Sequence, residues 1–359
     1  MSDLGAPAAM EGDGAYNRNS QVQAQALRGA LDLWRAAAGA VPLPSGGGPV
    51  TIADFGAAAG RNSLEPMGLA VSRLRRRLGP QVPLSIVHVD VPGNDFTALF
   101  ETLRGDPQSY LAHDPLTFAL AAGGSFFGPV LPPASVTLGW SSWAVHWLSR
   151  APCGVPDHIL AELSGDAAVR AAFAEQAAQD WRSFLESRAG ELQAGGRLVV
   201  MTIADTGEGP AYAPILTAIR DALEDLVARG DLARAEVDAM VVPTVTRDAP
   251  AYAAPFTGPD AVPGLRLLTL EIRAGDDAIW PLYQREGDAL AWAAHWVGFL
   301  RAAVFPTLAL RLVDGSPERR RSFFERLEQG AIARLALRPA PMAVHFSHMM
   351  IEKDGGGAP

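Results

Sequence analysis

The feature that most constrains the fold is a change from strand to helix and back to strand patterns in the first third of the chain. Residues 50–55, VTIADF, are rich in β-forming side chains, and residues 84–91, LSIVHVDV, form a second apolar run of strand length. Between them, from Asn62 to Leu78, apolar residues recur at helical spacing. This order predicts a βαβ unit with parallel strands and a right-handed crossover.

Later segments extend this unit. Further strands are predicted at 135–140, 196–203, 265–273 and 341–351, and helices within 157–193, 211–240, 286–304 and 316–335. We therefore expect an α/β fold, a doubly wound and mostly parallel sheet with an α-helical cap. The expected core is 1–205 with 265–274 and 340–352, and the expected substrate-binding cap is 206–264 with 275–339.

The turn after the first strand, TIADFGAAAGRN, predicts a nucleoside site. Gly56 and Gly60 let the backbone approach a ligand, but the loop lacks the GxGxxG set of a dinucleotide site and the GKS or GKT of a P-loop. An acidic loop containing Asp54 suits a ligand that brings positive charge instead of phosphate. S-adenosylmethionine is such a ligand, with a sulfonium, an amino acid and a ribose.

An acid at the end of the second strand can accept hydrogen bonds from both ribose hydroxyls, and Asp90 stands there. The alternative for Asp90 is a helix cap for the PGNDF segment. Asp95 fits that role better, because it precedes the helical pattern directly.

Composition narrows the partners. The net charge is −9, so we expect no nucleic acid partner, and we expect the arginines of RLRRRLG (73–79) to form a solvated helix end. No long apolar run and no signal peptide is recognised, and Cys153 is the single cysteine, so we expect a cytoplasmic protein without a membrane segment. We expect no metal site, because His345 and His348 would point to opposite faces of a strand and His88 lies in an apolar one.

Several separated motifs resemble one family. They are EGDGAYNRNSQVQ (11–23), IADFGAAAGRNSL (52–64), VDVPGNDFTALF (89–100), GSFFG (124–128), SSWAVHWLS (141–149) and DWRSFLESRAGELQAGGRLVV (180–200). Their order and spacing resemble the SABATH family of salicylate- and jasmonate-type carboxyl methyltransferases. The family is mainly from plants and has bacterial members, and we expect a bacterial member here. The resemblance implies the class I methyltransferase fold, S-adenosylmethionine as cofactor and a homodimer.

The resemblance also implies the cofactor residues. They are Tyr16, Ser20, Asp54, Gly56, Asn62, Asp90, Val91, Ser125 and Phe126. Ser20 and Asp54 would accept from the ligand's ammonium, and Asn62 would donate to its carboxylate. Ser125 and Phe126 would hold adenine by a polar edge and a flat face. For Tyr16, packing in the core or in a lid is an equal alternative to covering the methionine part.

Three residues match the family positions that clasp the substrate carboxylate: Gln23, His146 and Trp147, with Trp143 beside them as a further substrate residue. Gln23 and Trp147 would donate N–H groups and His146 would shape the wall. The sequence departs from the family pattern at Trp143, where plant members have Tyr, at the alanines 57–59, and at Val245, where an aromatic residue is expected. The identity of the substrate therefore does not carry over.

The expected reaction is esterification of a small aromatic, indolic or fatty acid. A carboxylic acid is ionised at pH 7, so its oxygen needs no general base, and positioning and exclusion of water suffice. Two alternatives stay open: N-methylation of a heterocyclic small molecule, and non-catalytic binding of S-adenosylmethionine.

Overall fold

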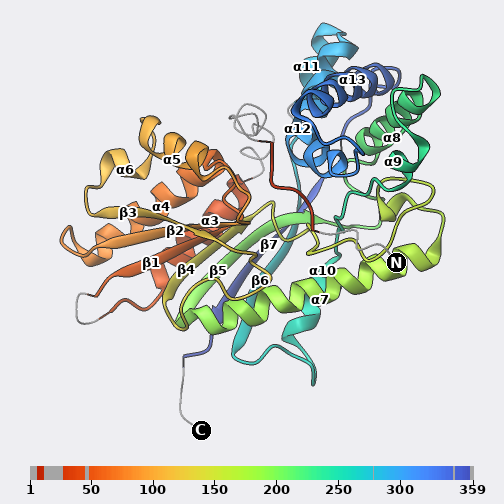
Figure 1. Cartoon of the computed structure of the whole chain (residues 1–359). Coiled ribbons are helices and arrows are strands. Elements are labelled where there is room, and N and C mark those ends of the chain that lie inside the picture. Colours follow the sequence, from red (N-terminus) through yellow and green to blue (C-terminus); the bar gives the residue numbers. More distant parts are fainter. Residues whose placement is uncertain (1–5, 12–26, 45–47, 278, 343, 356–359) are drawn as a thin grey trace.

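The core of the protein is a seven-stranded sheet in the order β3-β2-β1-β4-β5-β7-β6 (Figure 1). This computed structural model describes residues 6–11, 27–44, 48–277, 279–342 and 344–355. The strands are β1 (Val50–Phe55), β2 (Leu84–Asp90), β3 (Thr117–Gly123), β4 (Val136–Ser142), β5 (Leu192–Ala204), β6 (Leu265–Ala274) and β7 (His345–Lys353). From β3 through β5 neighbouring strands are parallel, whereas β7 is antiparallel to both β5 and β6.

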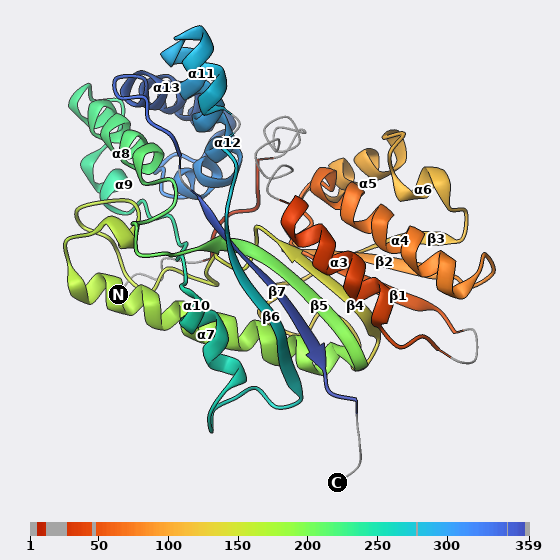
Figure 2. The same cartoon turned by 180° about the vertical axis from the view of Figure 1, so that it is seen from behind.

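Both faces of the sheet are covered, because successive residues of a strand point to opposite sides. Ile52 belongs to the apolar cluster on the side of helices α3 (Arg28–Ala40) and α4 (Leu64–Leu78), and its neighbour Ala53 to the cluster on the side of α7 (Ala167–Glu191). In β2, Ile86 and Val87 divide in the same way. Figure 1 shows α7 across one face, and Figure 2 shows α3 and α4 on the other.

Four shorter helices lie in the connections between strands β1 to β5. They are the short 3-10 helix η1 (Arg61–Ser63), α5 (Phe96–Gly105), α6 (Tyr110–His113) and the 3-10 helix η2 (Ala161–Leu163). Asp95 caps α5, since its Oδ1 accepts from the Ala98 N–H at 2.9 Å, and Asp166 caps α7 through the Ala168 N–H. The prediction that Asp95 begins a helix is thus confirmed.

A group of helices lies at one end of the sheet (Figure 1). It consists of α8 (Ala213–Ala228), α9 (Arg234–Asp238), α11 (Trp280–Glu286), α12 (Ala289–Ala309) and α13 (Pro317–Leu335). The short helices α10 (Ala249–Ala253) and η3 (Ala254–Phe256) lie apart from this group, next to β6 and α7. The Tyr252 ring stands edge-on to Trp181 of α7, at 5.7 Å between centroids.

The arginine cluster lies at a helix end as expected, and Arg76 and Arg77 are exposed there. It does end α4, and Gly79 follows in the left-handed region with φ 75°. However, Arg75 is paired with Asp114, and Arg77 donates to the carbonyl oxygens of Ala38 and Val41 at 2.9 and 2.8 Å. Two of the arginines therefore tie α4 to neighbouring segments.

Candidate functional site

The glycine turn lies at the carboxyl end of β1. Gly56 and Gly60 have φ of 89° and 82°, which other residues adopt at a cost. The N–H groups of Gly56 and Ala57 both donate to the carbonyl oxygen of Val89, at 2.9 and 3.2 Å. The turn is thereby fixed against the end of β2. An ideal Cβ on Gly56 would lie only 2.5 Å from the Cβ of Ala144, so the turn also touches the loop after β4.

Asp90 ends β2 beside this turn. Its Oδ2 accepts from the Ala58 N–H at 2.7 Å and its Oδ1 from the Val91 N–H at 2.8 Å. Burial raises the pKa of the Asp90 carboxyl to about 6, against the effect of these two hydrogen bonds. Each carboxylate oxygen has a further lone pair, so the group can still accept from two ligand hydroxyls.

Asp54 is held by an internal network. It is buried, and its Oδ2 accepts from the Ser63 hydroxyl at 2.5 Å and lies 2.9 Å from Nδ1 of His88. The Nε2 of His88 lies 2.9 Å from the Tyr110 hydroxyl. Ser63 was not among the residues predicted to interact with Asp54. Asn62 stands next to it in η1, directly after the turn.

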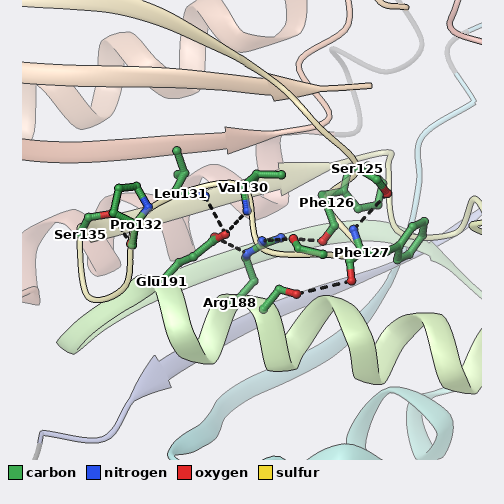
Figure 3. Close-up of polar contacts among 11 residues, drawn as sticks. Ser125, Phe126, Phe127, Val130, Leu131, Pro132, Ser135, Arg188 and Glu191 are labelled. Carbon is green, nitrogen blue, oxygen red and sulfur yellow. Dashed lines mark hydrogen bonds and ion pairs between the residues drawn. The ribbon is translucent and has the colours of Figure 1, made fainter. Parts of the chain in front are cut away.

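The loop after β3 carries Ser125 and Phe126 and is fastened to α7 (Figure 3). Arg188 donates to the carbonyl oxygens of Phe126 and Gly128 at 2.8 and 3.1 Å. Glu191 accepts from the Val130 and Leu131 N–H groups, at 2.6 and 3.0 Å, and pairs with Arg188 at 2.8 Å. Both charged side chains are almost fully buried.

The loop after β4 carries Trp143, His146 and Trp147. Trp143 has φ 58°, and its ring is edge-on to Phe346 and Phe299 at 5.0 and 5.9 Å. The segment 242–247 lies alongside this loop: Trp147 bridges to Thr244, and the Val245 N–H donates to the His146 carbonyl oxygen at 3.0 Å.

The side chains of His146 and Trp147 carry no charge, and each brings an N–H group to this loop. Nδ1 of His146 lies 3.1 Å from the Thr202 hydroxyl. Burial, with Arg247 nearby, lowers the pKa of the His146 imidazole to about 3, so the ring is neutral at pH 7. No hydrogen bond joins the indole N–H of Trp147 to another of the described residues.

Trp143, His146 and Trp147 line one pocket between the sheet and the helical group. The other lining residues are Met10, Leu160, Glu162, Ile203, Ala211, Tyr212, Leu216, Val242, Thr244, Thr246, Phe299, Leu300, Ala303 and Val304. Met10 comes from an N-terminal arm, residues 6–11, that lies on α12. There the Glu11 N–H donates to the Ala302 carbonyl oxygen at 2.8 Å, and the Glu11 carboxylate pairs with Arg301 at 3.0 Å.

Three expected site residues, Tyr16, Ser20 and Gln23, lie outside the described residues. Within the described ranges, no three side chains of metal-binding type stand together. In the same part of the chain, no helix has the length and apolar character needed to cross a membrane.

The sheet order, the reversed β7 and the glycine turn beside a strand-end acid define a class I methyltransferase of the Rossmann-like type, so the expected fold class is confirmed. A family model described as SAM dependent carboxyl methyltransferase matches residues 7–250. The chain belongs to this family, in agreement with the resemblance to the SABATH enzymes.

Individual relatives agree. The chain is 30% identical to indole-3-acetate O-methyltransferase 1 of Oryza sativa, over 94% of this chain and 89% of the relative. It is also 30% identical to a methyltransferase of Gibberella fujikuroi, where the match covers 66% of this chain and only 64% of the relative. The solved structure of a loganic acid methyltransferase with SAH superposes with a TM-score of 0.78 over 98% of this chain and 99% of that one, at 19% identity, which shows the same fold.

Proposed function

We propose that the chain is an S-adenosylmethionine-dependent O-methyltransferase that converts the carboxylate of a small aromatic, indolic or fatty acid to its methyl ester. The observation that carries the proposal is the contact between the two halves of the site. The glycine turn touches the His146 and Trp147 loop at Ala144, so a ligand held on the turn would adjoin a pocket wall of neutral N–H donors.

The described residues fit this cofactor. When bound, S-adenosylmethionine supplies an electrophilic methyl group. Asp90 would accept from the ribose hydroxyls through the lone pairs that Ala58 and Val91 leave free. The other proposed cofactor residues are Asp54, Gly56, Asn62, Val91, Ser125 and Phe126, together with Tyr16 and Ser20 outside the described part.

The acid side requires positioning but no base. The substrate carboxylate is already ionised at neutral pH. Trp147 would donate its indole N–H to one carboxylate oxygen, and the neutral His146 would shape the wall beside it. Gln23 is proposed as a further donor and lies outside the described residues. Holding the reacting oxygen in line with the methyl group can account for several kcal/mol of the barrier, roughly 7–11 at most, and the apolar walls exclude water.

We propose that the helical residues of 206–264 and 275–339 serve as the substrate-binding cap. Tyr212 and Leu216 of the α8 region and Phe299 and Val304 of α12 line the pocket, which supports this division. The short helices of 249–256 pack against β6 of the sheet instead.

The test is transfer of label from [methyl-³H]S-adenosylmethionine to benzoate, indole-3-acetate, cinnamate and octanoate, with a neutral heterocycle as comparison. Esters release labelled methanol in mild base, whereas N-methyl products keep their label. Base-labile product from at least one acid is expected. Only base-stable product would support the N-methyltransferase alternative, and binding of cofactor without any turnover would support the non-catalytic one; either result contradicts the proposal.

We further propose that the protein is a bacterial member of the family that acts in the cytoplasm as a homodimer. The homodimer is suggested by the family resemblance and the compartment by the single cysteine. The bacterial source stays a prediction, because the relatives named above come from a plant and a fungus. Light scattering coupled to gel filtration tests the dimer, and a mass of about one 37.9 kDa chain at micromolar concentration would contradict it.

A further inference from the structure

One acid stands in the wall of the substrate pocket. Glu162, in η2, is the only Asp or Glu among the described residues that line it, and Lys and Arg are absent from that lining. Glu162 and Thr246 also line a second, adjoining cavity with Arg170, Asp205 and Phe173. Glu162 therefore lies where the pocket meets the next hollow.

Glu162 has few partners. Its Oε1 accepts from the Thr246 N–H at 3.1 Å, and the Thr246 hydroxyl lies beside it. No arginine, lysine or histidine of the described residues lies within ion-pair distance of it, although Arg247 acts on it from further away. Burial raises the pKa of the Glu162 carboxyl to about 7, with Asp205 adding to this effect and Arg247 opposing it.

The neighbouring arginines, Arg170 and Arg247, donate mainly to backbone carbonyl oxygens, although Nε of Arg247 has no partner among the described residues. The Arg247 guanidinium donates to the carbonyl oxygens of Val145 and Ala177 at 2.8 and 2.6 Å, and Arg170 donates to that of Ser164. His146, in the same pocket, is neutral. The partly buried carboxyl has only the N–H and the hydroxyl of Thr246 beside it, so its oxygens keep lone pairs for a further donor. A structural role alone does not require the acid, because a glutamine oxygen could accept from Thr246 equally well.

We propose that Glu162 is a specificity-determining residue that selects acids bearing a second polar group, a hydroxyl or amino hydrogen-bond donor, besides the carboxylate that is methylated. The inference rests on the proposed function. Glu162 accepts from this donor, and the same carboxyl disfavours acids with a second carboxylate in the pocket.

The experiment uses matched acids that differ by the donor: 3-phenylpropanoate against 3-(4-hydroxyphenyl)propanoate, and hexanoate against 6-hydroxyhexanoate, with hexanedioate as the second-carboxylate case. We measure kcat/KM for the wild-type chain, Glu162→Met and Glu162→Gln. Glu175→Met, on the exposed face of α7, is the matched control.

In at least one pair the wild type is expected to prefer the hydroxylated acid, and Glu162→Met to lose about 10- to 100-fold of this preference, as for a hydrogen bond to a charged group. Glu162→Gln should keep part of it. Glu162→Met should use the plain acid at least as well as the wild type, which separates lost recognition from misfolding. The wild-type preference should be larger at pH 8 than at pH 6, and that of Glu162→Gln should not change.

The outcomes separate the two proposals. Ester formation with equal ratios in wild type and Glu162→Met would overturn the role of Glu162 and leave the proposed function standing. If no acid is esterified, the proposed function fails. Quenching of tryptophan fluorescence by the same acid pairs then decides the inference, and equal affinities within both pairs would overturn it.

Discussion

At the scale of single residues, the proposed substrate pocket presents neutral donors where a cation would be the stronger anion binder. His146 is neutral and Trp147 can only donate, and the described lining contains no lysine or arginine. The substrate carboxylate loses its charge when it becomes an ester. An arginine would stabilise the charged ground state more than the transition state and would raise the barrier.

The first prediction concerns Trp147→Phe. The ring is kept and the N–H donor is lost, so kcat/KM for the acid should fall about 10- to 100-fold, the value of a hydrogen bond to a charged group. Binding of S-adenosylhomocysteine, measured by calorimetry, should not change. Trp181→Phe is the control, because it also loses a buried N–H bond, to the Tyr252 carbonyl oxygen, on the other face of the sheet. Equal loss of kcat/KM in both variants would refute the role of Trp147.

The second prediction concerns Asp90. Its carboxyl has a raised pKa of about 6 and must be ionised to accept from two hydroxyls. The affinity for S-adenosylhomocysteine should therefore be full at pH 8 and fall as the pH drops below 6, up to tenfold per pH unit. Asp90→Asn should bind at least tenfold more weakly at pH 8 and show no such decrease. Titration calorimetry at pH 5, 6, 7 and 8 measures both, and a pH-independent wild type would contradict the assignment.

Sequence reasoning reached some of these residues and not others. The position of Asp90 at the end of a strand and the helix cap at Asp95 could be predicted because both depend on local sequence, whereas the ribose contact of Asp90 stays a prediction. The link from Asp54 to His88 could not, because the two are neighbours only through the parallel register of β1 and β2. Glu162 was missed for the same reason, since it lies in a single 3-10 turn that only the tertiary structure brings to the pocket.

At the scale of elements, α7 connects the two loops that carry the proposed site residues. Near its C-terminus, Arg188 and Glu191 hold the loop of Ser125 and Phe126. Earlier in α7, Asp180 accepts hydrogen bonds from the N–H and the hydroxyl of Ser149, both at 2.7 Å. Ser149 comes just after the Trp147 loop. The sequence predicted a long helix here. It did not predict these contacts, because polar residues that are buried in the fold, such as Asp180 and Arg188, look like exposed ones in the sequence pattern.

The third prediction tests this connection with Arg188→Met. Glu191 would stay buried without its partner, which destabilises a fold by about 3–5 kcal/mol, and the loop of Ser125 and Phe126 would lose two donors. The melting temperature and the affinity for S-adenosylhomocysteine should both fall. Arg182→Met, whose pair with Glu186 on the same helix is exposed, should change either by little. Fluorimetry and calorimetry measure the two effects; a normal cofactor affinity in Arg188→Met would contradict the role of α7.

At the scale of the whole molecule, the late strands complete a sheet that the early strands begin. The sequence predicted strands in the last hundred residues and their place in the core, and β6 and β7 confirm this. It did not predict that β7 would insert between β5 and β6, because strand order depends on long-range pairing. It also missed β3, whose sequence TFALAAG is dominated by small residues without apolar alternation.

The fourth prediction follows from S-adenosylmethionine as the cofactor and from its proposed site at the turn after β1 and at Asp90. S-adenosylhomocysteine at one hundred times its Kd should stabilise the native chain by about 2.7 kcal/mol, visible as a rise in melting temperature. NAD and ATP at the same concentration should give no shift, because the turn lacks the glycines that a pyrophosphate requires. A shift with NAD and none with S-adenosylhomocysteine would place the chain with a different cofactor.

One hydrogen bond that holds the N-terminal arm on α12 depends on Pro306, which has no N–H group. Pro306 lies inside α12 and has no N–H, so the Ala302 carbonyl oxygen one turn earlier is left without its helical donor, and the Glu11 N–H takes that place. Pro306→Ala would restore a competing donor within α12. The helix should become more stable, and Met10 and the arm should come away from the pocket. Hydrogen exchange at the Glu11 N–H measures this effect, and it should become faster.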